Sequence, residues 1–99
     1  MGFIAMMMSI LSNKPECYVC GARHNLHRHH CIYGSANRRL SDADGLWIYL
    51  CPYHHNMSDH GVHFDKKLDE RIKQDAQNAW EERYGNREAF IKRYGKSYL

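Results

Sequence analysis

The sequence predicts a small α+β domain that is stapled by a bound metal ion and has helices in its C-terminal third. Its 99 residues suffice for a single domain spanning 1–99. A chain of this length buries only about 60–65% of its unfolded surface, so a staple is expected to add stability. All eight histidines fall within residues 24–63 and all four cysteines within 17–51, and this clustering supplies the candidate ligands. A short apolar segment at 46–50 and a three- to four-residue apolar spacing after residue 65 predict the strand and helix content.

The composition argues against a disordered protein and against a membrane-spanning one. Hydrophobic residues make up 43% of the chain and aromatic residues 12%, which argues against disorder. No apolar run approaches the ~20 residues that a membrane span needs, so no membrane partner is expected. The net charge is only +3, but residues 21–40 contain four arginines and no acidic residue. A phosphate-bearing partner is therefore expected near the histidine-rich centre.

The N-terminal part predicts little regular structure. Residues 1–13 are expected to form a short strand or helix that ends at Lys14-Pro15. Residues 15–25 form a cysteine-bearing turn, in which Gly21 suits the tight bend after the second cysteine. The apolar start of the chain lacks a basic segment before it, so we expect no signal peptide and a cytoplasmic location. In that reducing compartment the cysteines are expected to bind metal and not to form disulfides.

The middle of the chain predicts two strands. The first runs over 26–33 and leads into a polar, turn-rich loop over 34–45. The second covers the apolar and aromatic segment 46–50.

Three helices are expected after these strands. Pro52 begins the first, which carries His54 and His55 and extends toward His60. An amphipathic helix follows from Asp65 to about Tyr84, because Leu68, Ile72, Ala76 and Ala79 recur at helical spacing. Asn86 and Gly95 are suitable caps for a last helix that ends at about Tyr94. The domain thus divides into a metal-binding core over 14–63 and a helical extension over 64–99.

Two knuckles of equal spacing predict a structural zinc site. Cys17-x2-Cys20 and Cys51-x2-His54 together supply the ligands of a tetrahedral Cys3His site. Two-residue spacing lets both ligands of a knuckle reach one ion from a single turn. Cys31 is left over and is expected to be a small core residue.

The His29-His30 pair lies at the end of the first predicted strand. Adjacent strand residues point to opposite faces, so a metal ligand and a neighbouring base require a bend at the strand end. His27 shares a face with His29, which suits a role beside the metal ligands. Strand, strand and helix would bring these residues and His55 around one cation.

The order Cys-x2-Cys-Gly, His-His, strand and Leu50-Cys51-x2-His54-His55 resembles that of the HNH (ββα-metal) endonucleases. The similarity is greatest to small phage-encoded members with a zinc knuckle, and it covers residues 17–63. The C-terminal pattern Phe90-x4-Gly95-Lys96-x-Tyr98 also resembles that of phage proteins of this type.

The resemblance implies specific roles at the second metal site. His29 would bind the catalytic ion, His30 would be the general base that activates water, and His55 would be the next ligand. The family's middle Asn has no counterpart, because its position near Gly45-Leu46 holds no Asn. Several residues after Pro52 could complete the ligand set of the catalytic ion. The alternatives are His55 alone, His55 with Asp59, or Asn56 with His60, and His63 is a further candidate.

The resemblance also implies the activity, which is metal-dependent hydrolysis of DNA phosphodiester bonds. Its cofactors would be a structural Zn²⁺ and a catalytic divalent ion, either Mg²⁺, Mn²⁺, Ni²⁺ or Zn²⁺. Arg28, Arg38 and Arg39 are the candidate DNA-binding residues. Phage recombination or packaging proteins would be further partners, in the cytoplasm of a bacterial host.

Two other classes of function compete with the nuclease. One is a catalytically inactive, zinc-stapled module that binds nucleic acid or serves phage assembly. The other is a protein-binding phage accessory that docks through its apolar N-terminus. A free imidazole beside a metal ligand favours the nuclease, because a binding module does not need one.

Overall fold

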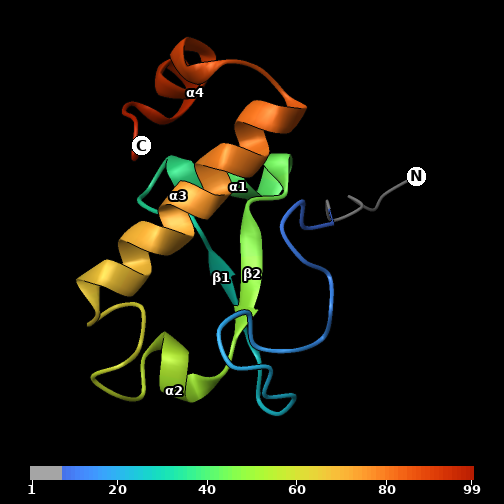
Figure 1. The fold of residues 1–99 in the computed structure, drawn as a ribbon, viewed down its shortest axis with the longest axis vertical. Coiled ribbons are helices and arrows are strands. Elements are labelled where there is room, and N and C mark those ends of the chain that lie inside the picture. The colour runs from blue at the N-terminus through green and yellow to red at the C-terminus, as the bar shows by residue number, and fades with distance from the viewer. Residues whose placement is uncertain (1–7) are drawn as a thin grey trace.

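The computed structural model describes residues 8–99 and has the α+β architecture that the sequence predicts (Figure 1). Its two strands form an antiparallel sheet at the centre, and α3 crosses that sheet diagonally. Part of the predicted N-terminal element lies outside the described residues, and 8–13 form neither helix nor strand. Among residues 8–99, no helix is both long and apolar enough to span a lipid bilayer. In chain order the elements are β1 (His27–His30), α1 (Asn37–Asp44), β2 (Trp47–Leu50), α2 (Pro52–His55), α3 (Lys66–Arg83) and α4 (Arg87–Tyr94).

The register of the sheet decides which histidines share a face. His29 lies opposite Ile48, and His30 lies opposite Trp47. Because side chains alternate along a strand, His27 and His29 share one face of β1, and Arg28 and His30 share the other. Both predicted strands are confirmed, although β1 is shorter than the predicted segment 26–33.

The prediction of a loop over 34–45 is wrong, because α1 occupies most of it. The helix is mostly polar, with Leu40 as its one large apolar side chain, so no apolar periodicity marks it. Tertiary contacts hold it instead. The buried Ser41 hydroxyl donates to the Ile32 carbonyl at 2.6 Å. Gly45 ends the helix in the left-handed conformation, and its N–H donates to the Ser41 carbonyl.

The predicted helix after Pro52 ends at His55 and does not reach His60. Beyond it the chain turns back, so that the Val62 N–H donates to the His54 carbonyl at 2.8 Å. Gly61 permits this return, because a Cβ there would lie 2.7 Å from the His55 carbonyl oxygen. The helical spacing that suggested the pairs His55 with Asp59 and Asn56 with His60 is therefore absent, because α2 ends at His55.

The two C-terminal helices agree with the prediction. The Asp65 carboxylate caps α3 by accepting from the Leu68 N–H, and the Asn86 side chain caps α4 by accepting from the Ala89 N–H. Gly95 ends α4 in the left-handed conformation.

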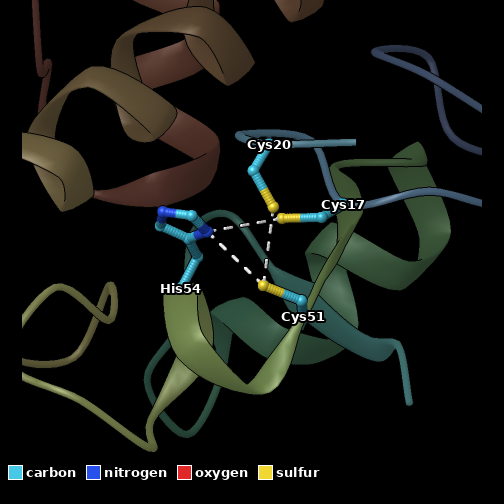
Figure 2. Close-up of side chains that lie close together, drawn as sticks. All are labelled: Cys17, Cys20, Cys51 and His54. Atoms are coloured by element: carbon cyan, nitrogen blue, oxygen red, sulfur yellow. Dashed lines mark hydrogen bonds between the residues drawn. The ribbon is translucent and has the colours of Figure 1, made fainter. Parts of the chain in front are cut away.

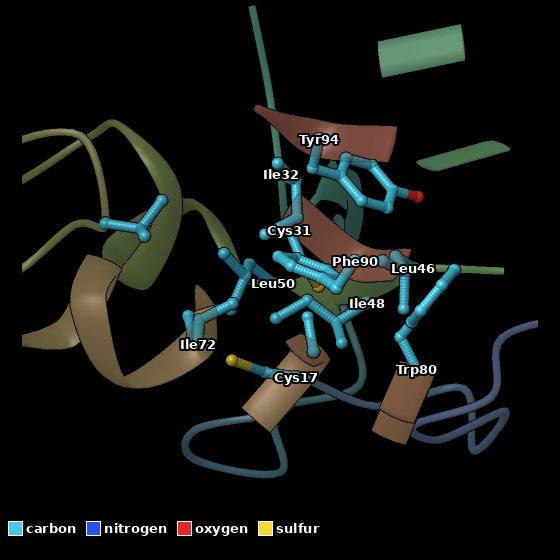
Figure 3. Close-up of a cluster of buried hydrophobic side chains, with 13 residues drawn as sticks. Cys17, Cys31, Ile32, Leu46, Ile48, Leu50, Ile72, Trp80, Phe90 and Tyr94 are labelled. Carbon is cyan, nitrogen blue, oxygen red and sulfur yellow. The ribbon is translucent and has the colours of Figure 1, made fainter. Parts of the chain in front are cut away.

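Buried side chains from the sheet, α3 and α4 meet in one hydrophobic cluster (Figure 3). The helical spacing in the sequence corresponds to the buried face of α3, which includes Ile72, Ala76 and Trp80. Cys31 is fully buried in this cluster, as predicted for a core residue, and burial raises the pKa of its thiol. The buried members of the cluster are Cys17, Cys31, Ile32, Leu46, Ile48, Leu50, Cys51, Val62, Ile72, Ala76, Trp80, Phe90 and Tyr94.

Asp44, the last residue of α1, connects that helix to α3 and α4. Its carboxylate accepts hydrogen bonds from Trp80 Nε1 at 2.8 Å and from the Tyr94 hydroxyl at 2.7 Å. The Arg93 guanidinium donates to it through Nε, at 2.6 Å, and through Nη2, at 2.8 Å. The carboxylate is only 11% exposed, so these donors replace the water it has lost.

We expect Asp44→Ala to lower the free energy of unfolding by about 3 kcal/mol, because it leaves the buried Trp80 indole and Tyr94 hydroxyl, and the partly exposed Arg93 guanidinium, without their acceptor. Urea denaturation followed by circular dichroism measures the change. Glu82→Ala, on an exposed position of α3, is the control and should stay within about 0.5 kcal/mol of the parent. Equal stability of Asp44→Ala and the parent would mean that the network does not hold α4 in place.

Candidate metal centres

A turn that precedes β1 presents two cysteines toward the end of β2 (Figure 2). Gly21 makes this turn with a φ of 79°, and its N–H donates to the Cys17 carbonyl at 2.9 Å. The Tyr18 N–H donates to the Tyr49 carbonyl at 2.8 Å, which docks the turn on β2. Backbone hydrogen bonds thus fix the positions of Cys17 and Cys20.

Cys51 and His54 complete the group from the start of α2. The Sγ atoms of Cys20 and Cys51 are 3.7 Å apart, and His54 Nδ1 lies 3.4 Å from Cys51 Sγ and 3.9 Å from Cys17 Sγ. Tetrahedral zinc, with bonds of about 2.3 Å to sulfur and about 2.0 Å to nitrogen, separates its ligand atoms by about 3.5–3.8 Å. The predicted grouping is therefore confirmed, and these four side chains can hold a structural metal such as zinc.

At Cys17 the local backbone favours the thiolate form that a metal requires. Burial alone would raise the pKa of the Cys17 thiol, but backbone N–H groups of Cys51, Cys20 and Val19 donate to its sulfur. Their combined effect holds the pKa of Cys17 below its ordinary value. Because the thiolate is the form that binds metal, the fold prepares this ligand before an ion arrives.

A second group of possible ligands consists of three imidazoles. His29 comes from β1, His55 ends α2, and His63 follows the turn at Gly61. Their ligand atoms all lie within 4.8 Å of one another. The Nε2 atoms of His55 and His63 are 3.2 Å apart, close to the roughly 3.3 Å between two nitrogen ligands of tetrahedral zinc. These three imidazoles could therefore hold a metal ion.

His29 gives the strongest sign of an additional partner. Its side chain is almost completely buried, yet Nε2 has no hydrogen-bond partner among residues 8–99. A buried polar atom without a partner is costly, and a metal ion would supply the missing one. Burial, followed by the proximity of His55 and His63, lowers the pKa of His29 to about 3. The ring is therefore neutral at physiological pH, which is the form that binds metal.

A fourth imidazole, His27, contacts this group from outside. Its Nδ1 lies 2.8 Å from Nδ1 of His55. His55 thus directs Nε2 toward His63 and Nδ1 toward His27. Metal-binding histidines commonly donate their other N–H to an outer acceptor, and His27 is in position to be that acceptor.

His30 and the three imidazoles line one cavity of about 240 Å³, together with Arg28, Tyr33 and Arg38. His29 and His30 reach the same space from opposite faces of β1 because His30 is its last residue. His30 Nε2 also lies 2.9 Å from Oδ1 of Asp42 on α1, and Arg28 Nη2 lies 2.8 Å from the same oxygen.

The other candidate residues lie elsewhere. Arg39 is exposed on α1 and does not line the cavity, whereas Arg28 and Arg38 do. Asn56 and His60 are exposed in the segment after α2, and His60 stacks on Tyr53 with ring centroids 5.3 Å apart. Neither of them lines the cavity.

Asp42 is the site residue that sequence reasoning missed. It lies in the stretch that was predicted to be a loop, and no motif marks it. The only available signal was its position as one of the few acidic residues close to the arginine-rich segment.

Comparison with known proteins adds no relative: no family model, curated protein or solved structure matches this chain.

Proposed function

We propose that this chain is a metal-dependent endonuclease of the HNH (ββα-metal) type, which hydrolyses phosphodiester bonds of DNA. One observation carries the proposal. A single cavity is lined by the three imidazoles of the possible metal site, by a further imidazole, His30, and by two arginines. The antiparallel pair β1 and β2, followed directly by α2, supports the ββα arrangement that the family resemblance implies, with α1 inserted between the strands.

In this mechanism His30 is the general base. It lines the cavity next to His29 but is not one of the three grouped imidazoles, so its ring remains available for proton transfer. Imidazole is the commonest base for this step near neutral pH. His30 would take the proton from a water molecule that attacks the phosphorus atom.

The three ligands would place a divalent ion beside that base. Such an ion would stabilise negative charge on the phosphoryl oxygens and on the leaving 3′-oxygen. Because His29, His55 and His63 offer only nitrogen, the ligand set favours Zn²⁺ or Ni²⁺ over Mg²⁺.

The Cys3His group would hold a structural zinc that positions the second site. His54 belongs to the first group and His55, the next residue, to the second. A zinc ion would therefore fix the short helix α2 and, with it, the direction of the His55 ring. Arg28 and Arg38 at the cavity would bind the phosphates on either side of the bond that is cut.

The metal dependence of cleavage tests this function. Plasmid nicking or linearisation is measured against increasing Mn²⁺, Ni²⁺, Zn²⁺ or Mg²⁺ concentration for the parent, His29→Ala and His63→Ala. Both substitutions should raise the metal concentration for half-maximal cleavage at least tenfold, because each removes one of three ligands.

His60→Ala is the comparison variant, since His60 lies in the same segment as His63 but stacks on Tyr53. It should leave the metal dependence unchanged. A shift for His60→Ala with none for His63→Ala would place the ion elsewhere. DNA binding without cleavage under all four metals would favour the inactive binding module.

A further inference from the structure

We propose that Asp42 is a positioning residue for His30. Its carboxylate holds the imidazole with the proton on Nε2, so that Nδ1 carries the lone pair that accepts a proton. The catalytic consequence rests on the proposed function, in which His30 is the general base. The hydrogen bond and its effect on the ring can be measured without any substrate.

The contact follows from how α1 is anchored. Ser41 and Asp44, on either side of Asp42 in α1, are buried: the Ser41 hydroxyl donates to the Ile32 carbonyl, and the Asp44 carboxylate accepts from Trp80 and Tyr94. These contacts fix the rotation of the helix about its axis. Asp42 consequently projects toward the face of β1 that carries His30, and its Oδ1 reaches His30 Nε2 at 2.9 Å.

The chemistry of the two groups fixes the position of the proton. An ionised carboxylate only accepts hydrogen bonds, so the ring nitrogen that faces Asp42 must carry hydrogen. A neutral imidazole has one N–H, which leaves the lone pair on its other nitrogen, Nδ1. The contact thus selects one tautomer and one orientation of the ring. This is the same division of labour as in nucleophile–base–acid triads, in which a carboxylate orients the base.

Asp42 acts through His30 and not on the reacting atoms. It is absent from the side chains that line the cavity, whereas His30 is among them. It is about half exposed, so its contribution should be smaller than that of a buried triad carboxylate.

Arg28 offers a competing role for the same carboxylate. Its Nη2 lies 2.8 Å from Asp42 Oδ1, and its guanidinium stacks over the Trp47 ring at 4.3 Å from the centroid. If Asp42 served only to hold Arg28 for DNA binding, its loss would raise KM. If it orients His30, its loss lowers kcat.

The first arm of the experiment is NMR of the ring nitrogens of His30 at alkaline pH. The parent should show the Nε2–H form. Asp42→Asn should increase the fraction of the Nδ1–H form, because its amide can donate a hydrogen bond to Nε2. Asp42→Glu should retain the parent pattern, and Glu88→Gln on α4 is the matched control. An identical nitrogen pattern in the parent and Asp42→Asn overturns the proposal.

The second arm is single-turnover cleavage kinetics. Asp42→Asn should lower kcat about ten- to a hundredfold, less than removal of the base itself, with KM and the metal dependence unchanged. Asp42→Glu should recover part of that loss. In a His30→Ala background Asp42→Asn should have no further effect, because the two residues act as one unit. A change in KM alone, or an equal loss in both backgrounds, overturns the proposal.

The two arms separate this proposal from the proposed function. A tautomer that depends on Asp42 in a protein that cuts no DNA supports the positioning role and rejects the nuclease. Metal-dependent cleavage that requires His30 but is unchanged by Asp42→Asn supports the nuclease and rejects the positioning role.

Discussion

Removal of the metal from the group Cys17, Cys20, Cys51 and His54 should unfold the protein. These ligands join the turn before β1 to α2, and no other covalent staple is present, since all four cysteines are free thiols. Structural zinc contributes about 10–16 kcal/mol in small zinc domains, which equals or exceeds the whole stability of a typical domain. Titration with a strong chelator, followed by far-ultraviolet circular dichroism, should show a cooperative loss of helix signal that zinc restores.

Cys20→Ser is the sharpest variant for this prediction, because Cys20 is exposed and its loss creates no cavity. We expect the Cys20→Ser protein to lose its zinc and, as a result, to fail to fold. Cys31→Ala is the control: it removes a buried thiol outside the group and should keep its zinc despite some loss of stability. In a His63→Ala background, which weakens the second group, elemental analysis should find about one zinc per chain. A zinc-free protein with an unchanged melting curve would contradict the prediction.

The sequence predicts the Cys3His group well because its constraint is local. A two-residue spacing places both ligands of a knuckle on one turn, and Gly21 supplies the bend that the turn needs. The same is true of α3 and α4, where apolar spacing and the caps Asp65 and Asn86 lie within the helices that they define. Short-range rules therefore predict these elements without knowledge of the fold.

The second site is harder to predict because its residues meet through the return of the chain. His63 lies beside His55 because the backbone reverses direction at Gly61. A side chain at position 61 would clash with the His55 carbonyl. Four-residue helical spacing instead favours residues that do not line the cavity, such as His60. The position of the candidate ligand His63 thus depends on a turn and not on a helical repeat.

The helix α1 was missed for a related reason. It is stabilised by contacts that span long stretches of sequence, such as those between Asp44 and residues of α3 and α4. Its own residues are polar, with one partly buried leucine, Leu40, on the core side. The contact between Asp42 and His30 depends on how α1 packs beside β1, and no short-range pattern in the sequence predicts it.

Substitution of His30 should have the largest effect on activity. We expect His30→Ala to lower the cleavage rate by ~10²–10⁴, the usual contribution of a general base. The ring is partly exposed at the end of β1, so the fold should survive. The metal concentration for half-maximal cleavage should be unchanged, because the three grouped imidazoles are intact. Single-turnover cleavage of a plasmid at saturating metal, with DNA binding measured in parallel, separates these effects.

His24→Ala is the matched control for this variant, since His24 is exposed just before β1 and belongs to neither ligand group. It should cut DNA at the parent rate. A loss in His30→Ala that disappears at higher metal concentration would make His30 a ligand and not a base. Cleavage by His30→Ala at the parent rate would remove the general base from the mechanism. Activation of the attacking water would then have to come from the ion held by the three imidazoles or from a base other than His30.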